Sequence, residues 1–395
     1  MNANFREKLD EHIENQRDFY KSMFFDILRF ETVNPPGNEE AMAKYVLSQV
    51  EGTNSTCSLQ YVKPDRPNAL AELSFGKSGK KLVWNAHMDV VPPGESVNWN
   101  TEPFAPVEID GKIYARGSSD DKGGLMSMII AYRTLQELQP ELNGSVLLCG
   151  VMGEETGGMG TKYWVEQGGK ADAAIVGEPS KMELVVAHRG AYRPIFGFKG
   201  RTAHSSEPDL GDNAIYSAAR FVCRVAELNE EFKASGHPLT GSPTIAATVF
   251  QGGVKNNVIP DYAEVSIDRR LSPGETYDDA EKQLLEVLKQ MQEKGEIGEW
   301  ELVRYLNNKG AAACDLQDPL VLELQDVLKE RSYKDDVCGM RATTDMYLMQ
   351  DVGIPTVIFG PGDMGLAHCP NEYIQFQEIL DAAKIYAELA VRYLQ

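Results

Sequence analysis

The chain has 395 residues, and its 39 lysines and arginines against 59 aspartates and glutamates give a formal net charge of −20. Because such an acidic body repels a phosphate backbone, we expect no nucleic-acid partner. With 42% hydrophobic and 25% charged residues, the composition is that of an ordinary globular protein, and the length predicts two or three domains.

The sequence predicts neither a transmembrane segment nor the disulfide bonds of a secreted protein. The longest apolar runs, such as residues 125–132, are far shorter than the roughly 18 residues that a span requires. The N-terminal segment is polar and charged, unlike a secretory signal. The six cysteines are scattered without a CxxC pair, which argues against disulfides or a thiolate zinc site. We therefore expect a cytoplasmic protein that does not interact with membranes.

Helices and short apolar strands alternate along most of the chain. Residues 5–30 have apolar side chains at helical spacing that end before a turn at 34–37, and a second helix is predicted at 39–50. A third helix, around 125–138, lies between the first two of the predicted strands, which are 82–89, 146–155, 173–179 and 356–362. This alternation is typical of an α/β fold with a mostly parallel sheet covered by helices, in which ligands bind beyond the carboxyl ends of the strands.

The middle of the chain has a different order of elements. Strand, helix, two strands, helix and strand follow one another at 191–199, 212–229, 244–251, 262–271, 276–292 and 299–305. This β-α-β-β-α-β order is that of the ferredoxin-like fold. We therefore predict an inserted α+β domain at residues 191–305 and a first domain made of residues 1–190 and 306–395.

Side chains able to bind metals follow several predicted strands. His87 and Asp89 lie on the same side of a strand end, so that one can bind a metal while the other orients it. Similar candidates are Asp120, at the start of a predicted helix, and three residues at strand ends, Glu154, Glu155 and Glu178. Taken singly, these are also explained by chance, by helix capping or by a solvated acidic surface. Their shared position after apolar strands and beside glycines favours a metal site instead, and the ligand types suit zinc, manganese or cobalt, with enough ligands for two ions.

Nine motifs follow one another along nearly the whole chain: HMD at 87–89, ARGSSDDKGG at 115–124, GEE at 153–155, GEP at 177–179, GRTAHSSEP at 200–208, NNVIP at 256–260, DRRL at 268–271, TTD at 343–345 and FGPGDMGLAHCPNE at 359–372. In these motifs and their order the chain resembles the dinuclear-zinc M20 family of aminopeptidases, carboxypeptidases and N-acyl amino acid deacylases. This resemblance implies a metal-dependent hydrolase whose inserted domain is a lid and dimerisation domain.

The resemblance also implies a ligand set. Asp120 would bridge two divalent metal ions, expected to be Zn²⁺ with Co²⁺ or Mn²⁺ as alternatives. His87 and Glu178 would complete one metal site, and Glu155 and His368 the other. The family pattern further implies a cis peptide bond after the bridging residue, between Asp120 and Asp121.

Further roles follow from the same resemblance. Glu154 would be the general base and Asp89 would orient His87. His204 would stabilise the oxyanion, either in its own subunit or from the partner of a homodimer formed through the lid. Substrate-binding residues would be Asn257, Arg270 and Thr344. The Arg270 guanidinium suits a substrate carboxylate, although a surface salt bridge is the ordinary alternative.

We therefore expect hydrolysis of the amide bond of an N-acyl amino acid, of the acetylornithine or succinyl-diaminopimelate type. A di- or tripeptidase or a carboxypeptidase stays open, because the shared motifs set the chemistry and leave the pocket undefined. A non-catalytic homologue that acts as a binding protein is disfavoured by the intact ligands and base. A doubly wound nucleotide enzyme is disfavoured by the lack of a GxGxxG or GxxxxGK[ST] loop after a strand.

Overall fold

The computed structural model describes residues 3–395, which divide into two compact units. The first unit comprises the chain up to Val186 together with Cys314–Cys338 and Thr344–Gln395. The second comprises Ala187–Ala313 and Gly339–Thr343. The inserted unit is therefore longer than the predicted 191–305, and it also receives a short segment, 339–343, that is distant in sequence and was not predicted.

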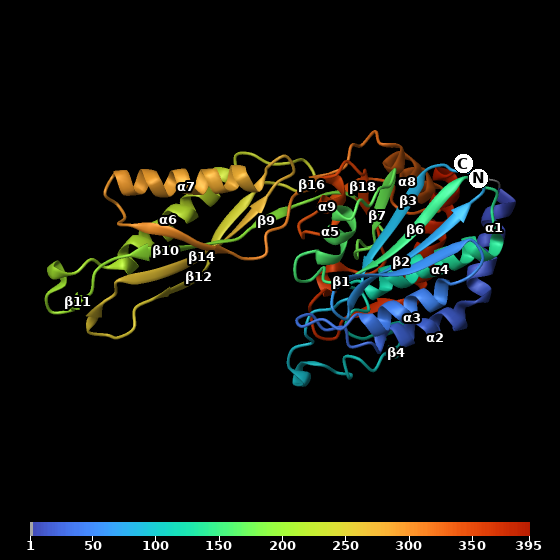
Figure 1. The fold of residues 1–395 in the computed structure, drawn as a ribbon, viewed down its shortest axis with the longest axis horizontal. Helices are drawn as coiled ribbons and strands as arrows, with labels where there is room; N and C mark the ends of the chain where they lie inside the picture. The colour runs from blue at the N-terminus through green and yellow to red at the C-terminus, as the bar shows by residue number, and fades with distance from the viewer. Residues whose placement is uncertain (1–2) are drawn as a thin grey trace. The chain divides into compact units, whose positions relative to one another are not determined.

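A nine-stranded sheet forms the centre of the first unit (Figure 1). Its order is β1(Ser55–Lys63), β2(Arg66–Phe75), β6(Gly144–Val151), β3(Lys81–His87), β7(Ala173–Val176), β18(Thr356–Ile358), β8(Leu184–His188) and β16(Ala312–Ala313), with β17(Val337–Met340) also paired to β8. The four middle strands, from β6 to β18, are mutually parallel, which confirms the predicted α/β fold. On one side of these strands, β1 pairs with β2 and β2 pairs with β6, both in antiparallel orientation. The two residues between β1 and β2 are too few for the crossover that a parallel pair needs.

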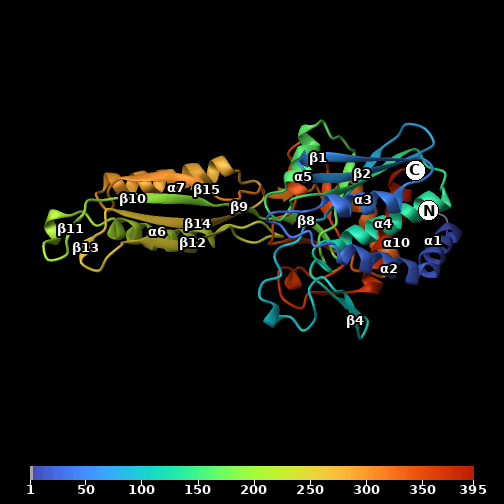
Figure 2. The same ribbon diagram turned by 60° about the horizontal axis from the view of Figure 1, so that its bottom comes forward.

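Helices cover both faces of this sheet. They are α1(Ala3–Asn15), α2(Arg17–Leu28), α3(Glu40–Val50), α4(Lys122–Leu138), α5(Met159–Glu166), α8(Pro319–Glu330), α9(Met346–Gln350) and α10(Phe376–Tyr393). Strand β3 shows the two faces, since Trp84 packs against Tyr386 of α10 whereas its neighbour Val83 belongs to a buried cluster with Trp164 of α5 and Met349 of α9. Helices α3, α4 and α10 lie together in Figure 2.

Two details of the first unit differ from the sequence prediction or add to it. The helix expected at 5–30 is broken at Gln16 into α1 and α2. A small sheet of β4(Val107–Ile109), β5(Lys112–Tyr114) and β19(Tyr373–Gln375) joins the chain before α4 to the chain before α10. Among the helices of residues 3–395, none has the length and apolar character needed to cross a bilayer.

The second unit has the ferredoxin-like order that was predicted. Its main elements are β9(Gly190–Tyr192), β10(Pro194–Lys199), α6(Ala214–Phe232), β12(Thr244–Gly252), β14(Tyr262–Leu271), α7(Tyr277–Glu293) and β15(Trp300–Tyr305). The sheet order is β12-β14-β10-β15 with antiparallel neighbours, and β9 extends β14. A small ladder of β11(Ala203–His204) and β13(Val258–Ile259) lies at one end of this unit (Figure 1).

Aromatic packing holds α6 on the sheet of the second unit. Phe221 is fully buried, and its ring centroid lies 5.6 Å from that of Phe196 and 5.5 Å from that of Phe198. Phe196 in turn meets Trp300 edge-on. This cluster joins the helix to two strands, so it is central to the stability of the unit.

We expect Phe221→Ala to lower the free energy of unfolding of the second unit by about 3–5 kcal/mol, because it removes a buried ring and leaves a cavity. Urea denaturation followed by tryptophan fluorescence, to which Trp300 contributes from this cluster, measures the loss. The matched control is Tyr216→Ala on the same helix, where the side chain is 61% exposed. Equal stability losses in the two variants would contradict the assignment of Phe221 to the core.

Candidate metal centre

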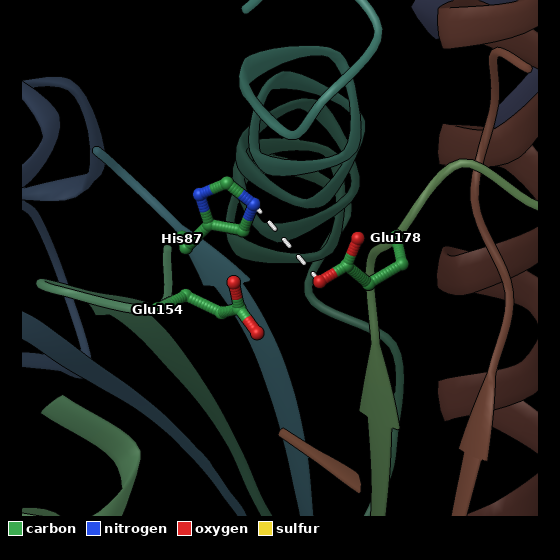
Figure 3. Close-up of side chains that lie close together, drawn as sticks. All are labelled: His87, Glu154 and Glu178. Carbon is green, nitrogen blue, oxygen red and sulfur yellow. Dashed lines mark ion pairs between the residues drawn. The ribbon is translucent and has the colours of Figure 1, made fainter. Parts of the chain in front are cut away.

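The carboxyl ends of three neighbouring parallel strands bring polar side chains to one edge of the central sheet. His87 is the last residue of β3, Glu154 and Glu155 follow β6, and Glu178 follows β7. Because β6, β3 and β7 are adjacent and parallel, their ends meet at this edge. Figure 3 shows the side chains of His87, Glu154 and Glu178 directed toward one another.

Asp120 and His368 reach the same place from outside the sheet. Asp120 precedes α4 and lies with Oδ1 2.9 Å from Nε2 of His87 and with Oδ2 3.4 Å from Nε2 of His368. His368 is also 3.0 Å from Oε2 of Glu155, and His87 is 3.9 Å from Oε1 of Glu178. The two Asp120 oxygens thus face two different histidines. The peptide bond between Asp120 and Asp121 is cis, as the family pattern implied.

Two overlapping groups of ligand atoms are close enough to surround an ion. One group is formed by His87, Glu154 and Glu178, and the other by His87, Asp120 and Glu155; within each, the ligand atoms lie within 4.8 Å of one another. All of these residues are buried except the partly buried Glu155. Imidazole nitrogens and carboxylate oxygens without a thiolate are the donors that zinc, manganese and cobalt accept.

The carboxylates of the cluster carry more negative charge than the two histidines balance. Burial, reinforced by the Asp120 charge, raises the pKa of Glu155 to about 7, and burial raises the pKa of Glu178 well above its ordinary value. Burial opposes ionisation of Asp120 as well, but hydrogen bonds from His368 and His87 hold its pKa well below the usual range. The pKa of His368 is raised to about 10 by its hydrogen bonds to Asp120 and Glu155.

A buried oxygen with no partner supports the fit to cations. Within residues 3–395, Oε1 of Glu155 has no hydrogen-bond donor, although the other oxygen of this carboxylate meets His368. Buried acceptors of this kind are rare unless an ion or a water satisfies them. The donor set, the excess of acidic groups and this oxygen together fit divalent cations.

Asp89 holds two segments of the site through different atoms. Nδ1 of His87 hydrogen bonds to the main-chain oxygen of Asp89 at 2.8 Å, whereas the carboxylate oxygen Oδ1 of Asp89 is 3.7 Å away. The carboxylate instead accepts the main-chain N–H groups of Glu154 and Glu155, at 3.1 and 3.2 Å. It also accepts the side-chain amide of Asn34 at 2.7 Å. Asp89 therefore contacts the His87 ring through its backbone and the Glu154–Glu155 loop through its side chain, and its role in orienting His87 stays a prediction.

Asn34 was missed by the sequence reasoning. Its Asn-Pro-Pro-Gly context was interpreted only as a turn. In the structure its amide donates both to Asp89 and to Oγ1 of Thr156. The sequence carries no signal for this role, because Asn34 is buried through contacts with residues that are distant in the chain.

Three expected site residues lie in the second unit. His204 pairs with Val258 in the β11–β13 ladder, and Asn257 accepts the N–H of Ser205 with its main-chain oxygen, so both lie at the same end of the unit. Nδ1 of His204 accepts the main-chain N–H of Ser206 at 3.2 Å, which leaves Nε2 to carry the proton of a neutral ring.

Arg270 lies at the opposite end of β14, where it pairs with Ala191 of β9. Its Nε donates to Oδ1 of Asp268 at 2.7 Å, so the salt bridge weighed as its ordinary role is present. Thr344, in the first unit, is fully buried, and its hydroxyl accepts the N–H of Met346 at the start of α9. Substrate contacts of Asn257, Arg270 and Thr344 stay predictions.

The chain is similar to several known proteins along nearly its whole length. The chain is 28% identical to an N-formyl-4-amino-5-aminomethyl-2-methylpyrimidine deformylase of Halalkalibacterium halodurans, over 96% of this chain and 95% of the relative. It is also 28% identical to a probable succinyl-diaminopimelate desuccinylase of Staphylococcus epidermidis, over 94% and 96%. A solved structure from Bacillus subtilis, described as a dinuclear metal binding peptidase from the M20 family, has a TM-score of 0.74 at 18% identity and covers 96% of this chain and 99% of that one.

The family assignment rests on a match along most of the chain. The sequence model of Peptidase family M20/M25/M40 matches residues 83–392, which include every residue of the metal cluster described above. The chain therefore belongs to peptidase family M20/M25/M40 and is a hydrolytic enzyme.

Proposed function

We propose that this hydrolase binds two divalent cations and cleaves the amide bond of an N-acyl amino acid, of the acetylornithine or succinyl-diaminopimelate type. The observation that carries the proposal is the convergence of two histidines and three glutamates around Asp120 at one edge of the sheet. One cation would be held by His87, Asp120 and Glu178, and the other by Asp120, Glu155 and His368. Zn²⁺ is the expected ion, with Co²⁺ or Mn²⁺ as alternatives.

Glu154 would act as the general base of the reaction, with Asp89 supporting it. Bound divalent cations supply Lewis acidity, which lowers the pKa of water and polarises the scissile carbonyl. Glu154 is buried beside His87 and Glu178 and takes part in one of the two ligand groups. Its carboxylate would accept a proton from the attacking water and return it to the nitrogen of the leaving amine. Asp89 keeps this glutamate in place through the main-chain N–H of Glu154.

The names of the relatives favour removal of an acyl group from nitrogen. One is called a deformylase and the other a probable desuccinylase, and both align along nearly the whole chain. Which acyl group this chain removes stays a prediction at 28% identity. A di- or tripeptidase or a carboxypeptidase is the alternative, favoured by the peptidase among the similar structures. The intact base and ligands disfavour a binding protein without activity.

The geometry of the second unit supports a site shared between two chains. Arg270 follows Tyr262 by eight residues along β14, a distance of about 27 Å at about 3.4 Å per residue. His204 and Asn257 lie beyond the Tyr262 end, as the positions of β9 and β11 in Figures 1 and 2 show. One N-acyl amino acid is too short to reach Arg270 and His204 of the same unit. His204 and Asn257 would therefore act from the second copy of a homodimer; the dimer and the cytoplasmic location stay predictions.

Replacing Glu154 by Gln is expected to lower kcat for the preferred substrate by about 10²–10⁴-fold, because the amide cannot accept the proton. A panel of N-acetyl, N-succinyl and N-formyl amino acids and dipeptides, assayed by amine release, identifies that substrate. The control is Glu166→Gln on the exposed side of α5, which should leave turnover unchanged. A Glu154→Gln variant with normal turnover would show that another group moves the proton.

Removal of metal by a chelator should abolish turnover and lower the melting temperature, because the buried carboxylates would repel one another without cations. Zn²⁺, Co²⁺ or Mn²⁺ added to the stripped protein should restore both properties. Amine release and calorimetry measure them, with the metal content determined in parallel. Full turnover by a protein that contains no metal would rule out the proposed chemistry.

Mixing two inactive variants tests whether the site is shared. We expect His204→Ala and Glu154→Gln each to be inactive alone and to regain activity, up to about a quarter of wild type, after they are unfolded and refolded together. The reason is that a mixed dimer has one site with both an intact Glu154 and an intact partner His204. If His204 acted within its own chain, no mixed dimer would contain a complete site, and the mixture would stay inactive.

A further inference from the structure

Glu372 is a buried carboxylate whose four hydrogen bonds all come from one loop. Oε1 accepts the main-chain N–H groups of Ser119 at 2.8 Å and Asp120 at 3.0 Å. Oε2 accepts the main-chain N–H of Gly117 at 3.0 Å and NH1 of Arg116 at 2.6 Å. The side chain of Glu372 is completely shielded from solvent. A single carboxylate thus fixes the backbone of the loop that ends in the residue facing both histidines.

The same contact reaches the segment that carries His368. NH1 of Arg116 donates not only to Glu372 but also to the main-chain oxygen of Cys369, at 3.2 Å, which is the residue after His368. The His368 side chain is 56% exposed, so little packing holds it in place. The Arg116–Glu372 ion pair therefore connects the loop of Asp120 to the segment of His368, alongside the hydrogen bonds between Oγ of Ser119 and the main chain of Asp363.

Two further features keep this connection rigid. The Arg116 guanidinium lies over the Trp99 ring, 5.1 Å from its centroid, and only 1% of the arginine is exposed. The residue after Glu372 begins β19, which pairs with β5 just before the loop. The Glu372 carboxylate therefore lies next to the β5–β19 pair, which joins two segments that are distant in sequence.

We propose that Glu372, together with Arg116, is a positioning residue that sets the distance between Asp120 and His368 and so builds the second cation site. It touches neither substrate nor cation; it acts through the main-chain N–H of Asp120 and through Arg116. Its action parallels that of Asp89, which accepts the main-chain N–H groups of Glu154 and Glu155. This inference rests on the proposed two-cation site, and neither Glu372 nor Arg116 has a place in the ligand set.

The test compares wild type with Glu372→Gln in the full chain. In this variant the NH₂ group of the glutamine replaces one carboxylate oxygen and faces N–H donors of residues 116–120. The two hydrogen bonds that this oxygen accepted are therefore lost. In metal-stripped protein, hydrogen exchange of the amides of Gly117, Ser119 and Asp120 should accelerate at least tenfold. Calorimetric titration with Zn²⁺ should show the second ion bound about 10–100-fold more weakly, the usual effect of losing a group that supports a metal ligand. kcat should fall at low Zn²⁺ and recover at high Zn²⁺, while KM stays unchanged.

The matched control is Glu388→Gln on α10. Glu388 is another fully buried carboxylate that pairs with three arginines, Arg6, Arg331 and Arg392. This variant should lose thermal stability while its Zn²⁺ binding and the exchange of the three loop amides stay unchanged. The comparison separates positioning from the general cost of removing a buried charge.

Unchanged Zn²⁺ affinity together with unchanged amide exchange in Glu372→Gln would overturn the inference. If that variant does not fold, Arg116→Lys provides the same test, because it keeps the charge and loses the fork that reaches both Glu372 and Cys369. A wild-type protein that binds no Zn²⁺ would overturn the proposed function instead, and exchange of the loop amides in the stripped protein would still decide whether Glu372 holds the loop.

Discussion

The main physical constraint on this protein is the negative charge gathered in the buried cluster around Asp120. Asp120, Glu154, Glu155 and Glu178 converge with two histidines, one of them buried and the other half-exposed. Burial opposes the ionisation of these carboxylates and they also repel one another, and both effects raise the pKa of Glu155 and Glu178. Divalent cations relieve it, and so the folded site is arranged to receive them.

The side chains of this cluster keep their positions only if the main chain of the loops that carry them is fixed by hydrogen bonds. Two carboxylates outside the ligand set do this. Asp89 accepts the N–H groups that precede the side chains of Glu154 and Glu155, and Glu372 accepts the N–H group of Asp120. Each is buried and accepts several donors, and so its own charge is compensated by hydrogen bonds and, for Glu372, by Arg116. The strand ends bring the ligands to one edge, and these carboxylates fix the loops that carry them.

In the second unit, the length of strand β14 sets the distance between two groups of predicted substrate-binding and catalytic residues. Its β14 strand separates Arg270 from the ladder that carries His204. A ferredoxin-like sheet is stiff because its antiparallel neighbours and the aromatic cluster around Phe221 hold it together. A stiff unit cannot bend to bring its two ends to one substrate, and this is the physical argument behind the proposed homodimer.

Sequence patterns alone were enough to predict most of the local structure and the class of enzyme, a hydrolase. Periodicity was sufficient for the parallel strands, the β-α-β-β-α-β order and the strand-end positions of His87, Glu155 and Glu178, since alternation and helical spacing are local properties. Asp120 was a candidate from its place at a helix start, and the family motifs added His368 and the bridging role of Asp120. No local pattern places these two residues together, because they reach the site through loops. The tertiary structure alone decided the break at Gln16, the return of residues 339–343 to the second unit, and the partners of Asn34, Arg116 and Glu372. These depend on contacts between segments up to about 250 residues apart, for which a single sequence carries no local signal.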